Sequence, residues 1–131
     1  MSVFIDSGAF GAAFFRSDRH HESIRSLFMR LPKRCFTSVL IVSETYSWFL
    51  HKMDEESART FLEFIDTLSP LTVLDAPHSL ERDTRRMLDR FRGSKLTYVD
   101  ACSLALIEKH RIKEVWGTDR DLTFTGATLI R

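Results

Sequence analysis

The sequence predicts an α/β protein whose parallel sheet is covered by helices on both faces. Short apolar runs rich in β-forming residues alternate along the chain with longer segments whose apolar residues recur at helical spacing. Alternation of this kind is typical of parallel sheets, because each helix carries the chain back to the edge where the next strand starts. We therefore expect a three-layer α/β/α arrangement, in which a parallel sheet of four to five strands forms the central layer.

The amino-terminal part of the chain predicts a strand, two helices and a second strand. The first strand and first helix are apolar, whereas the second helix carries apolar residues at helical spacing. Pro32 ends that helix, since proline cannot continue one. The predicted segments are Ser2–Ile5, Ser7–Phe15, His20–Leu31 and Arg34–Thr37.

Two consecutive helices and a third strand follow. The helices join at Met53 and Asp54, and the Asp54 carboxylate is expected to cap the second helix. The strand is rich in β-forming residues. The predicted segments are Val39–Lys52, Glu55–Leu68 and Leu71–Leu74.

The carboxyl-terminal part predicts two more helices and two short strands. Pro77 begins one helix and Gly93 stops it, in keeping with the preferences of proline and glycine for helix starts and ends. The second helix is apolar enough to be buried. The predicted segments are Pro77–Arg92, Val99–His110, Glu114–Trp116 and Thr128–Ile130.

Composition restricts the class of protein. The 131 residues fit a single domain, residues 1–131, and a formal net charge of +1 means that any affinity for nucleic acid must come from a local patch. No apolar run approaches the length of a membrane span, and the first residues lack the pattern of a signal peptide. Cys35 and Cys102 stand in apolar surroundings, so we expect reduced core thiols in a cytoplasmic protein.

Four acidic residues stand where a strand ends or a helix begins: Asp6, Glu44, Asp100 and Asp119. In open α/β sheets, ligands bind in the crevice outside the carboxyl ends of the strands, so we expect these carboxylates to meet there. Crowded carboxylates resist ionisation unless a cation compensates them. An all-oxygen ligand set suits Mg²⁺ or Mn²⁺, which indicates metal-assisted chemistry on a phosphate ester.

Each acid also has a purely structural alternative. Asp6 stands where it would cap the following helix, and Thr97-x-x-Asp100 has the spacing of a capping box. Asp119 is in position to cap a turn, as is Asp121. Glu44 has apolar helical neighbours, and its alternative is a buried salt bridge to an arginine. The joint placement of the four at one sheet edge favours the metal hypothesis.

Five stretches of the chain resemble the PIN-domain ribonucleases, particularly the small toxins of VapBC-type toxin–antitoxin pairs. Together they span nearly the whole sequence. They are Phe4-Ile-Asp-Ser-Gly-Ala-Phe10, Thr37-Ser-Val-Leu-Ile-Val-Ser-Glu44, Leu96-Thr-Tyr-Val-Asp-Ala-Cys-Ser-Leu-Ala105, Val115-Trp-Gly-Thr-Asp-Arg-Asp-Leu122 and Gly126-x-x-Leu-Ile130. Leu122 departs from the phenylalanine common in this family, a difference that concerns packing more than chemistry.

The resemblance implies a cation, Mg²⁺ or Mn²⁺, held by acids that match Asp6, Glu44, Asp100 and Asp119. It also implies an auxiliary acid at Asp121 and small hydroxyl residues beside the metal at Ser7 and Thr118. The function implied is metal-dependent endoribonuclease activity, in a toxin that a cognate antitoxin restrains. The resemblance also implies association into a homodimer. Two alternatives are a non-catalytic PIN-like module that binds RNA or protein and an unrelated α/β phosphotransferase. The second acid of an Asp-x-Asp motif is missing after Asp6, which disfavours the phosphotransferase.

The segment 81–95 is locally basic, with six positive and three negative charges. Arg82, Arg86 and Arg90 recur every four residues and line one helix face, where they are candidates for binding the RNA backbone. The alternative is a solvated face with helical ion pairs such as Glu81 with Arg85.

The tandem helices 39–52 and 55–68 carry several aromatic residues, among them Trp48 and Phe61. We expect a groove between these helices that receives an amphipathic antitoxin helix. The alternatives are that the chain's own side chains, or a second copy of the chain, fill it.

Overall fold

The computed structural model describes residues 1–131 and contains a five-stranded, fully parallel sheet. The strand order is β3-β2-β1-β4-β5, with β1 in the centre. The strands are β1 (Ser2–Ile5), β2 (Arg34–Ser38), β3 (Leu71–Leu74), β4 (Glu114–Trp116) and β5 (Thr128–Ile130). The predicted parallel sheet is confirmed at the upper limit of its expected strand number.

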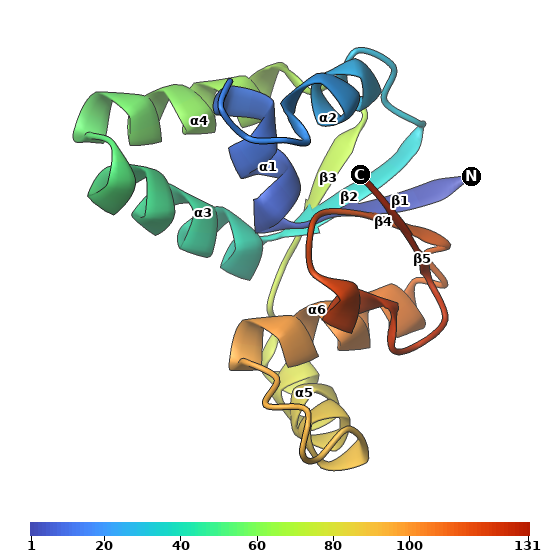
Figure 1. Ribbon diagram of the computed structural model, residues 1–131. Helices are drawn as coiled ribbons and strands as arrows, with labels where there is room; N and C mark the ends of the chain where they lie inside the picture. Colours follow the sequence, from blue (N-terminus) through green and yellow to red (C-terminus); the bar gives the residue numbers. More distant parts are fainter.

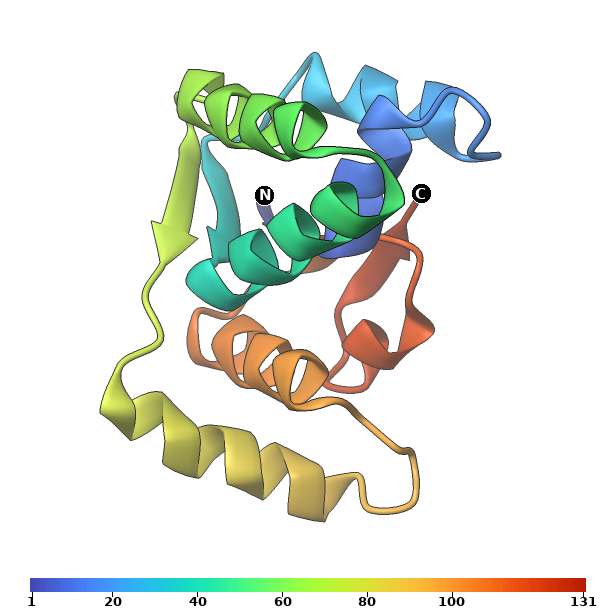
Figure 2. The same ribbon diagram turned by 90° about the vertical axis from the view of Figure 1, so that its left-hand side faces the viewer.

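Helices cover both faces of the sheet (Figures 1 and 2). One face carries four helices: α1 (Ser7–Phe14), α2 (His21–Phe28), α3 (Val39–Lys52) and α4 (Glu55–Thr67). The other face carries α5 (His78–Arg90), which packs on α6 (Tyr98–Lys109). The predicted three-layer arrangement is therefore confirmed. No helix is long and apolar enough to cross a membrane.

The strand order changes direction at β1. The chain builds β2 and β3 on one side of β1, then crosses the sheet through α5 and α6 and adds β4 and β5 on the other side. The neighbours β1 and β4 are therefore the point at which ligands bind in open α/β sheets, outside the carboxyl ends of the strands. The Asp6 N–H donates to the Trp116 carbonyl oxygen at 2.9 Å and joins the two strand ends there.

The core consists mainly of apolar side chains from the sheet and the helix faces that meet it. Phenylalanines of α1, α2, α3 and α4 contact one another: Phe10 meets Phe61 edge-on at 5.2 Å between ring centroids and also contacts Phe28, and Phe14 contacts Phe49 at 5.4 Å. The two cysteines are buried and unpaired, as predicted, and burial raises the pKa of the Cys35 thiol to about 12. Leu122 is also fully buried, which fits a packing role.

Some helix ends differ from their predicted positions. The second helix ends at Phe28 rather than Leu31, because Met29 and Arg30 form a turn and Leu31 precedes a proline, which disfavours helical backbone. A short 3₁₀ helix, η1 (Arg120–Thr123), was not predicted. The predicted cap at Asp54 is confirmed, since its Oδ1 accepts a hydrogen bond from the Ser57 N–H at 2.7 Å.

Candidate metal centre

Three of the four predicted acids flank the carboxyl ends of β1 and β4, and the fourth, Glu44, lies on α3. Asp6 follows β1, Asp119 follows β4, and Asp100 lies in the first turn of α6. Carboxylate oxygens of Asp100, Asp119 and Asp121 all lie within 4.8 Å of one another. Three acids from two separate segments of the chain thus form a cluster small enough for a single cation, and the predicted ligands Asp6 and Glu44 lie outside that cluster.

Asp6 is the buried member of the group, with only 5% of its surface exposed. It occupies the N-cap position of α1, but its side chain makes no capping hydrogen bond, so the capping alternative does not account for it. Its pKa is raised to about 7, chiefly by desolvation and further by the negative charges of Glu44, Asp100 and Asp119, while the Ser7 backbone N–H opposes the shift. These interactions place all four predicted acids in one electrostatic environment.

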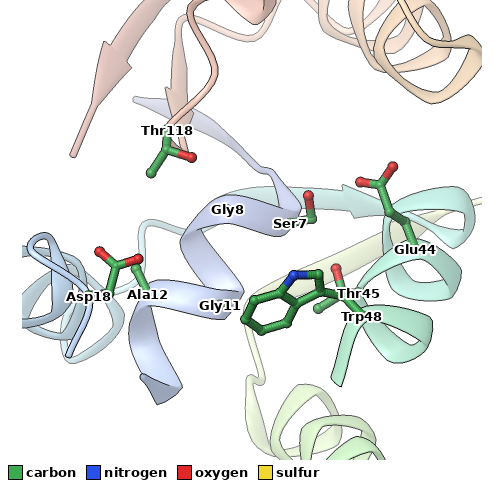
Figure 3. Close-up of a pocket in the computed structure, with 9 residues that line it drawn as sticks. All are labelled: Ser7, Gly8, Gly11, Ala12, Asp18, Glu44, Thr45, Trp48 and Thr118. Carbon is green, nitrogen blue, oxygen red and sulfur yellow. The ribbon is translucent and has the colours of Figure 1, made fainter. Parts of the chain in front are cut away.

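Two glycines allow the strand ends to approach the site closely. A Cβ at Gly117 would lie 3.1 Å from the Asp6 Cβ, and a Cβ at Gly8 would clash with the Thr118 Oγ1. Side chains at either position would therefore displace Asp6 or the β4 end. The two predicted auxiliary hydroxyl residues, Ser7 and Thr118, both line the pocket beside the acids (Figure 3).

Asp100 and Asp119 both form the capping hydrogen bonds that their structural alternatives predict. Each carboxylate also has one oxygen that remains available for another contact. The Asp100 N–H donates to Thr97 Oγ1 at 3.0 Å, and Asp100 Oδ2 accepts from the Thr97 N–H at 3.3 Å, which completes the capping box. Asp119 Oδ1 accepts from the Asp121 N–H at 2.9 Å. One oxygen of each carboxylate makes no such bond. Capping therefore orients these two acids without occupying them.

Asp121 is held against the same cluster by η1. Its pKa is raised by desolvation and then by the negative charges of Asp119 and Asp100. Asp121, the predicted auxiliary acid, is therefore part of the group of acids that surrounds the end of β4.

Glu44 corrects one expectation. The sequence suggested that it lies on an apolar face, but its side chain is exposed, because the buried face of α3 is formed by Ile41, Thr45 and Phe49. No burial cost therefore needs compensation. The salt-bridge alternative also fails, since the four ion pairs of the structure involve none of the site acids. Glu44 belongs to the site through its effect on the Asp6 pKa and its place in the pocket wall.

A pocket of about 330 Å³ opens beside the acids, between α1 and α3 (Figure 3). In that view Asp18 and Glu44 lie at opposite ends, with the indole ring of Trp48 between them. Asp18 comes from the loop after α1, and sequence reasoning did not find it, because nothing in its spacing connects it to the other acids. Only the packing of α1 against α3 brings it to this position.

The arginine face of α5 is largely paired. Arg86 lies 3.3 Å from Asp83, and Arg90 lies 3.0 Å from Glu108 of α6, while Arg85 pairs with Glu81 as the solvated-face alternative expects. Arg82 is exposed and makes no ion pair. These pairs are exposed and therefore weak, on the order of 0–1 kcal/mol, so phosphates can compete for the same arginines.

The middle of the predicted groove between α3 and α4 is filled by the chain itself, and a cavity of about 240 Å³ remains where the two helices join, with Met53 and Thr60 in its lining. Phe61 is fully buried against Phe10 and Phe49, so it is unable to contact a partner. The expectation that Phe61 lines an open groove is therefore wrong, because α1 packs over the helical pair. Trp48 and Met53 remain exposed on α3 and at its end.

Comparison with known proteins agrees with this architecture. A family model for the PIN domain matches residues 3–126. The chain belongs to the PIN-domain family. A search of curated proteins gives no significant match.

Several solved structures share the fold. VapC20 of Mycobacterium tuberculosis, described as a sarcin-ricin loop cleaving toxin, superposes with a TM-score of 0.89 at 22% identity over 99% of each chain. The DNA-bound VapBC complex of Salmonella typhimurium gives 0.70 at 16% identity over 99% of this chain and 97% of that one. A toxin–antitoxin complex of Klebsiella pneumoniae gives 0.65 at 16% identity over the same shares. The predicted family resemblance and fold are confirmed.

Proposed function

We propose that this PIN protein is a metal-dependent endoribonuclease that hydrolyses RNA phosphodiester bonds and acts as the toxin of a type II toxin–antitoxin pair. The observation that carries the proposal is the convergence of Asp6, Glu44, Asp100, Asp119 and Asp121 at the β1–β4 edge with no cationic side chain among their ion-pair partners. Mutually repelling carboxylates of this kind suit a hard divalent cation.

The donor set fits Mg²⁺ or Mn²⁺. Asp6, Asp100 and Asp119 would hold the cation, Glu44 would complete the set, and Asp121 would support it. A bound cation would lower the pKa of a water molecule and stabilise charge on the phosphate. The pKa of Asp6 is raised to about 7 without a cation, so part of the protein carries a proton on Asp6 at neutral pH. Cation binding would release that proton, since carboxylate ligands must be ionised.

The surrounding residues orient these carboxylates. The capping box fixes Asp100, the η1 backbone fixes Asp119, and Gly117 leaves room for the Asp6 side chain. The hydroxyl groups of Ser7 and Thr118 border the same space and are suited to hydrogen bond a phosphate oxygen or a water molecule. This chemistry does not use the RNA 2′-hydroxyl, so the products are expected to carry 5′-phosphate and 3′-hydroxyl ends.

The structural relatives support the toxin role. One is described as a toxin that cleaves the sarcin-ricin loop, and others are toxin–antitoxin complexes. By analogy, the chain would bind a cognate antitoxin and an RNA, and would associate as a homodimer. The competing candidate is a non-catalytic PIN-like module that binds RNA or protein. The retained set of acids disfavours it, because a purely structural module has no need for this repulsion.

Two substitutions test the proposal. Asp6→Asn and Asp100→Asn should each reduce Mg²⁺-dependent RNA cleavage by at least about 100-fold, because each removes a charged metal ligand. Asparagine at position 100 keeps an oxygen that can accept from Thr97, so the cap of α6 survives. Asp66→Asn, at an exposed position on α4, is the matched control. Cleavage at the wild-type rate by either site variant would show that the metal assignment is wrong.

A further inference from the structure

Trp48 is an exposed aromatic side chain held in a fixed orientation. It is 39% exposed, whereas the only other tryptophan, Trp116, is 3% exposed. Its ring meets Phe15 edge-on at 5.0 Å and Phe49 at 5.2 Å between centroids, and it lies against the Gly11 backbone of α1. An accessible indole that neighbours hold in place is suited to stacking on a nucleobase.

The pocket beside Trp48 disfavours a phosphate away from the Ser7 and Thr118 hydroxyls. Its charged lining residues are Asp18 and Glu44, and no lysine, arginine or histidine contributes to it. The remaining polar groups are hydroxyls, such as that of Ser7. A group bound here must therefore be uncharged or cationic and must offer hydrogen-bond donors to carboxylates. A volume of about 330 Å³ leaves room for a planar base.

The pocket lining includes neighbours of the site acids. Ser7 follows Asp6 in the chain, Thr118 precedes Asp119, and Glu44 is close enough for its charge to act on Asp6 (Figure 3). A nucleotide whose phosphate lies at the acids therefore has its base within reach of the indole ring. At the far end of the pocket, Asp18 Oδ1 accepts from the His20 N–H at 2.7 Å, which orients the carboxylate and leaves Oδ2 without a partner.

We propose that this pocket binds the base next to the cleaved phosphate, stacks it on Trp48 and selects guanine through Asp18. The inference rests on the proposed ribonuclease function. Enzymes that read an unstacked base combine stacking with hydrogen bonds to its Watson–Crick edge. Guanine presents two adjacent donors on that edge, N1–H and the N2 amino group, to the two oxygens of one carboxylate. Uracil presents one donor, and adenine and cytosine present only an amino group.

Nucleosides test the pocket without metal, phosphate or cleavage. The two indole N–H resonances of the ¹⁵N-labelled protein would be followed in EDTA as guanosine, adenosine, cytidine or uridine is added. We expect guanosine to shift the Trp48 resonance at millimolar concentration and the buried Trp116 resonance to stay in place as an internal reference. Trp48→Phe assigns the peak. Equal responses to all four nucleosides, or no response at Trp48, would overturn the proposal.

Two variants then separate stacking from selection in the cleavage of RNAs that differ at one base. Asp18→Asn keeps the oxygen that accepts from His20 and should reduce the preference for guanine at least about 5-fold. Trp48→Leu keeps an apolar side chain and should lower kcat/KM by roughly 5-fold to 150-fold, the range measured for the loss of base stacking. Leu62→Ala, at another exposed apolar position, is the control. An unchanged base preference in Asp18→Asn would overturn the selection by Asp18.

Failure of this proposal is distinguishable from failure of the proposed function. RNA cleavage by the wild-type protein without any nucleoside response would leave the ribonuclease intact and remove the base pocket. A guanosine response without RNA cleavage would support the base pocket and contradict the proposed ribonuclease function. If N-acetylarginine amide shifts Trp48 and no nucleoside does, the pocket receives a protein side chain and the base proposal is wrong.

Discussion

Replacing Asp6 by asparagine should stabilise the metal-free protein at alkaline pH. Burial and three neighbouring acids raise the Asp6 pKa from 3.8 to about 7, so ionisation of this group opposes folding. For a carboxyl group with a raised pKa, the stabilising contribution is fully present below pH 3.8 and is lost as the pH rises through 7. Asparagine carries no charge at any of these pH values and avoids the loss.

The size of the effect follows from the shift. A shift of about 3 units corresponds to about 4 kcal/mol, of which about 3 kcal/mol is lost between pH 5 and pH 8.5. The unfolding free energy of Asp6→Asn relative to the wild type should therefore rise by about 3 kcal/mol across that interval. For a domain of this size the corresponding change in Tm is roughly 10 °C.

Urea unfolding in EDTA, followed by circular dichroism at pH 5 and pH 8.5, measures this difference directly. Asp66→Asn should show the same stability relative to the wild type at both pH values, because its side chain is exposed. Mg²⁺ at pH 8.5 should stabilise the wild type and leave Asp6→Asn nearly unchanged, since binding to the folded state alone raises stability. If the difference between Asp6→Asn and wild type is the same at both pH values, the reasoning from burial and charge repulsion is refuted.

Three further predictions concern the surroundings of the site. Gly117→Ala should destabilise the protein by about 1–3 kcal/mol and weaken Mg²⁺ binding in calorimetry, because the added Cβ would lie 3.1 Å from that of Asp6; wild-type values for both would contradict the close approach. Replacing Arg82 and Arg86 by glutamine should reduce the salt dependence of RNA binding by about one unit of slope per lost contact, whereas an unchanged slope would leave these arginines with only their role on the solvated face. The product of an adjacent gene should co-purify with this chain and inhibit it, and polar substitutions at both Trp48 and Met53 should weaken that complex; full retention would place the antitoxin elsewhere.

The strands were predictable almost to the residue because each is a short apolar run between helices with clear ends. Ser2–Ile5, Leu71–Leu74 and Glu114–Trp116 have the predicted bounds. Helix ends were less accurate where local turns compete: α6 begins at Tyr98 rather than Val99, because Thr97 is its N-cap. The Thr97-x-x-Asp100 spacing indicates the cap, but whether the helix begins at Tyr98 or at Val99 depends on the backbone conformation at Thr97.

The candidate site was predictable where chain order determines it and unpredictable where packing does. Asp6 and Asp119 follow neighbouring parallel strands, so topology alone brings them to one edge. The exposure of Glu44 depends on the helical phase of α3, whose buried stripe is one residue away from it. The pairing of Arg90 with Glu108 and the position of Asp18 beside Trp48 arise from contacts between segments that are distant in the sequence. A local sequence pattern does not predict such contacts.

The most direct test of the metal-centre account is the end chemistry of RNA cut by the wild-type protein with and without a divalent cation. The account predicts cleavage in Mg²⁺ or Mn²⁺, none in EDTA, recovery when the cation is restored, and products with 5′-phosphate and 3′-hydroxyl ends. Undiminished cleavage in EDTA, or products that end in a 2′,3′-cyclic phosphate, would contradict it, because either result would mean that the carboxylate cluster does not direct a metal-assisted hydrolysis.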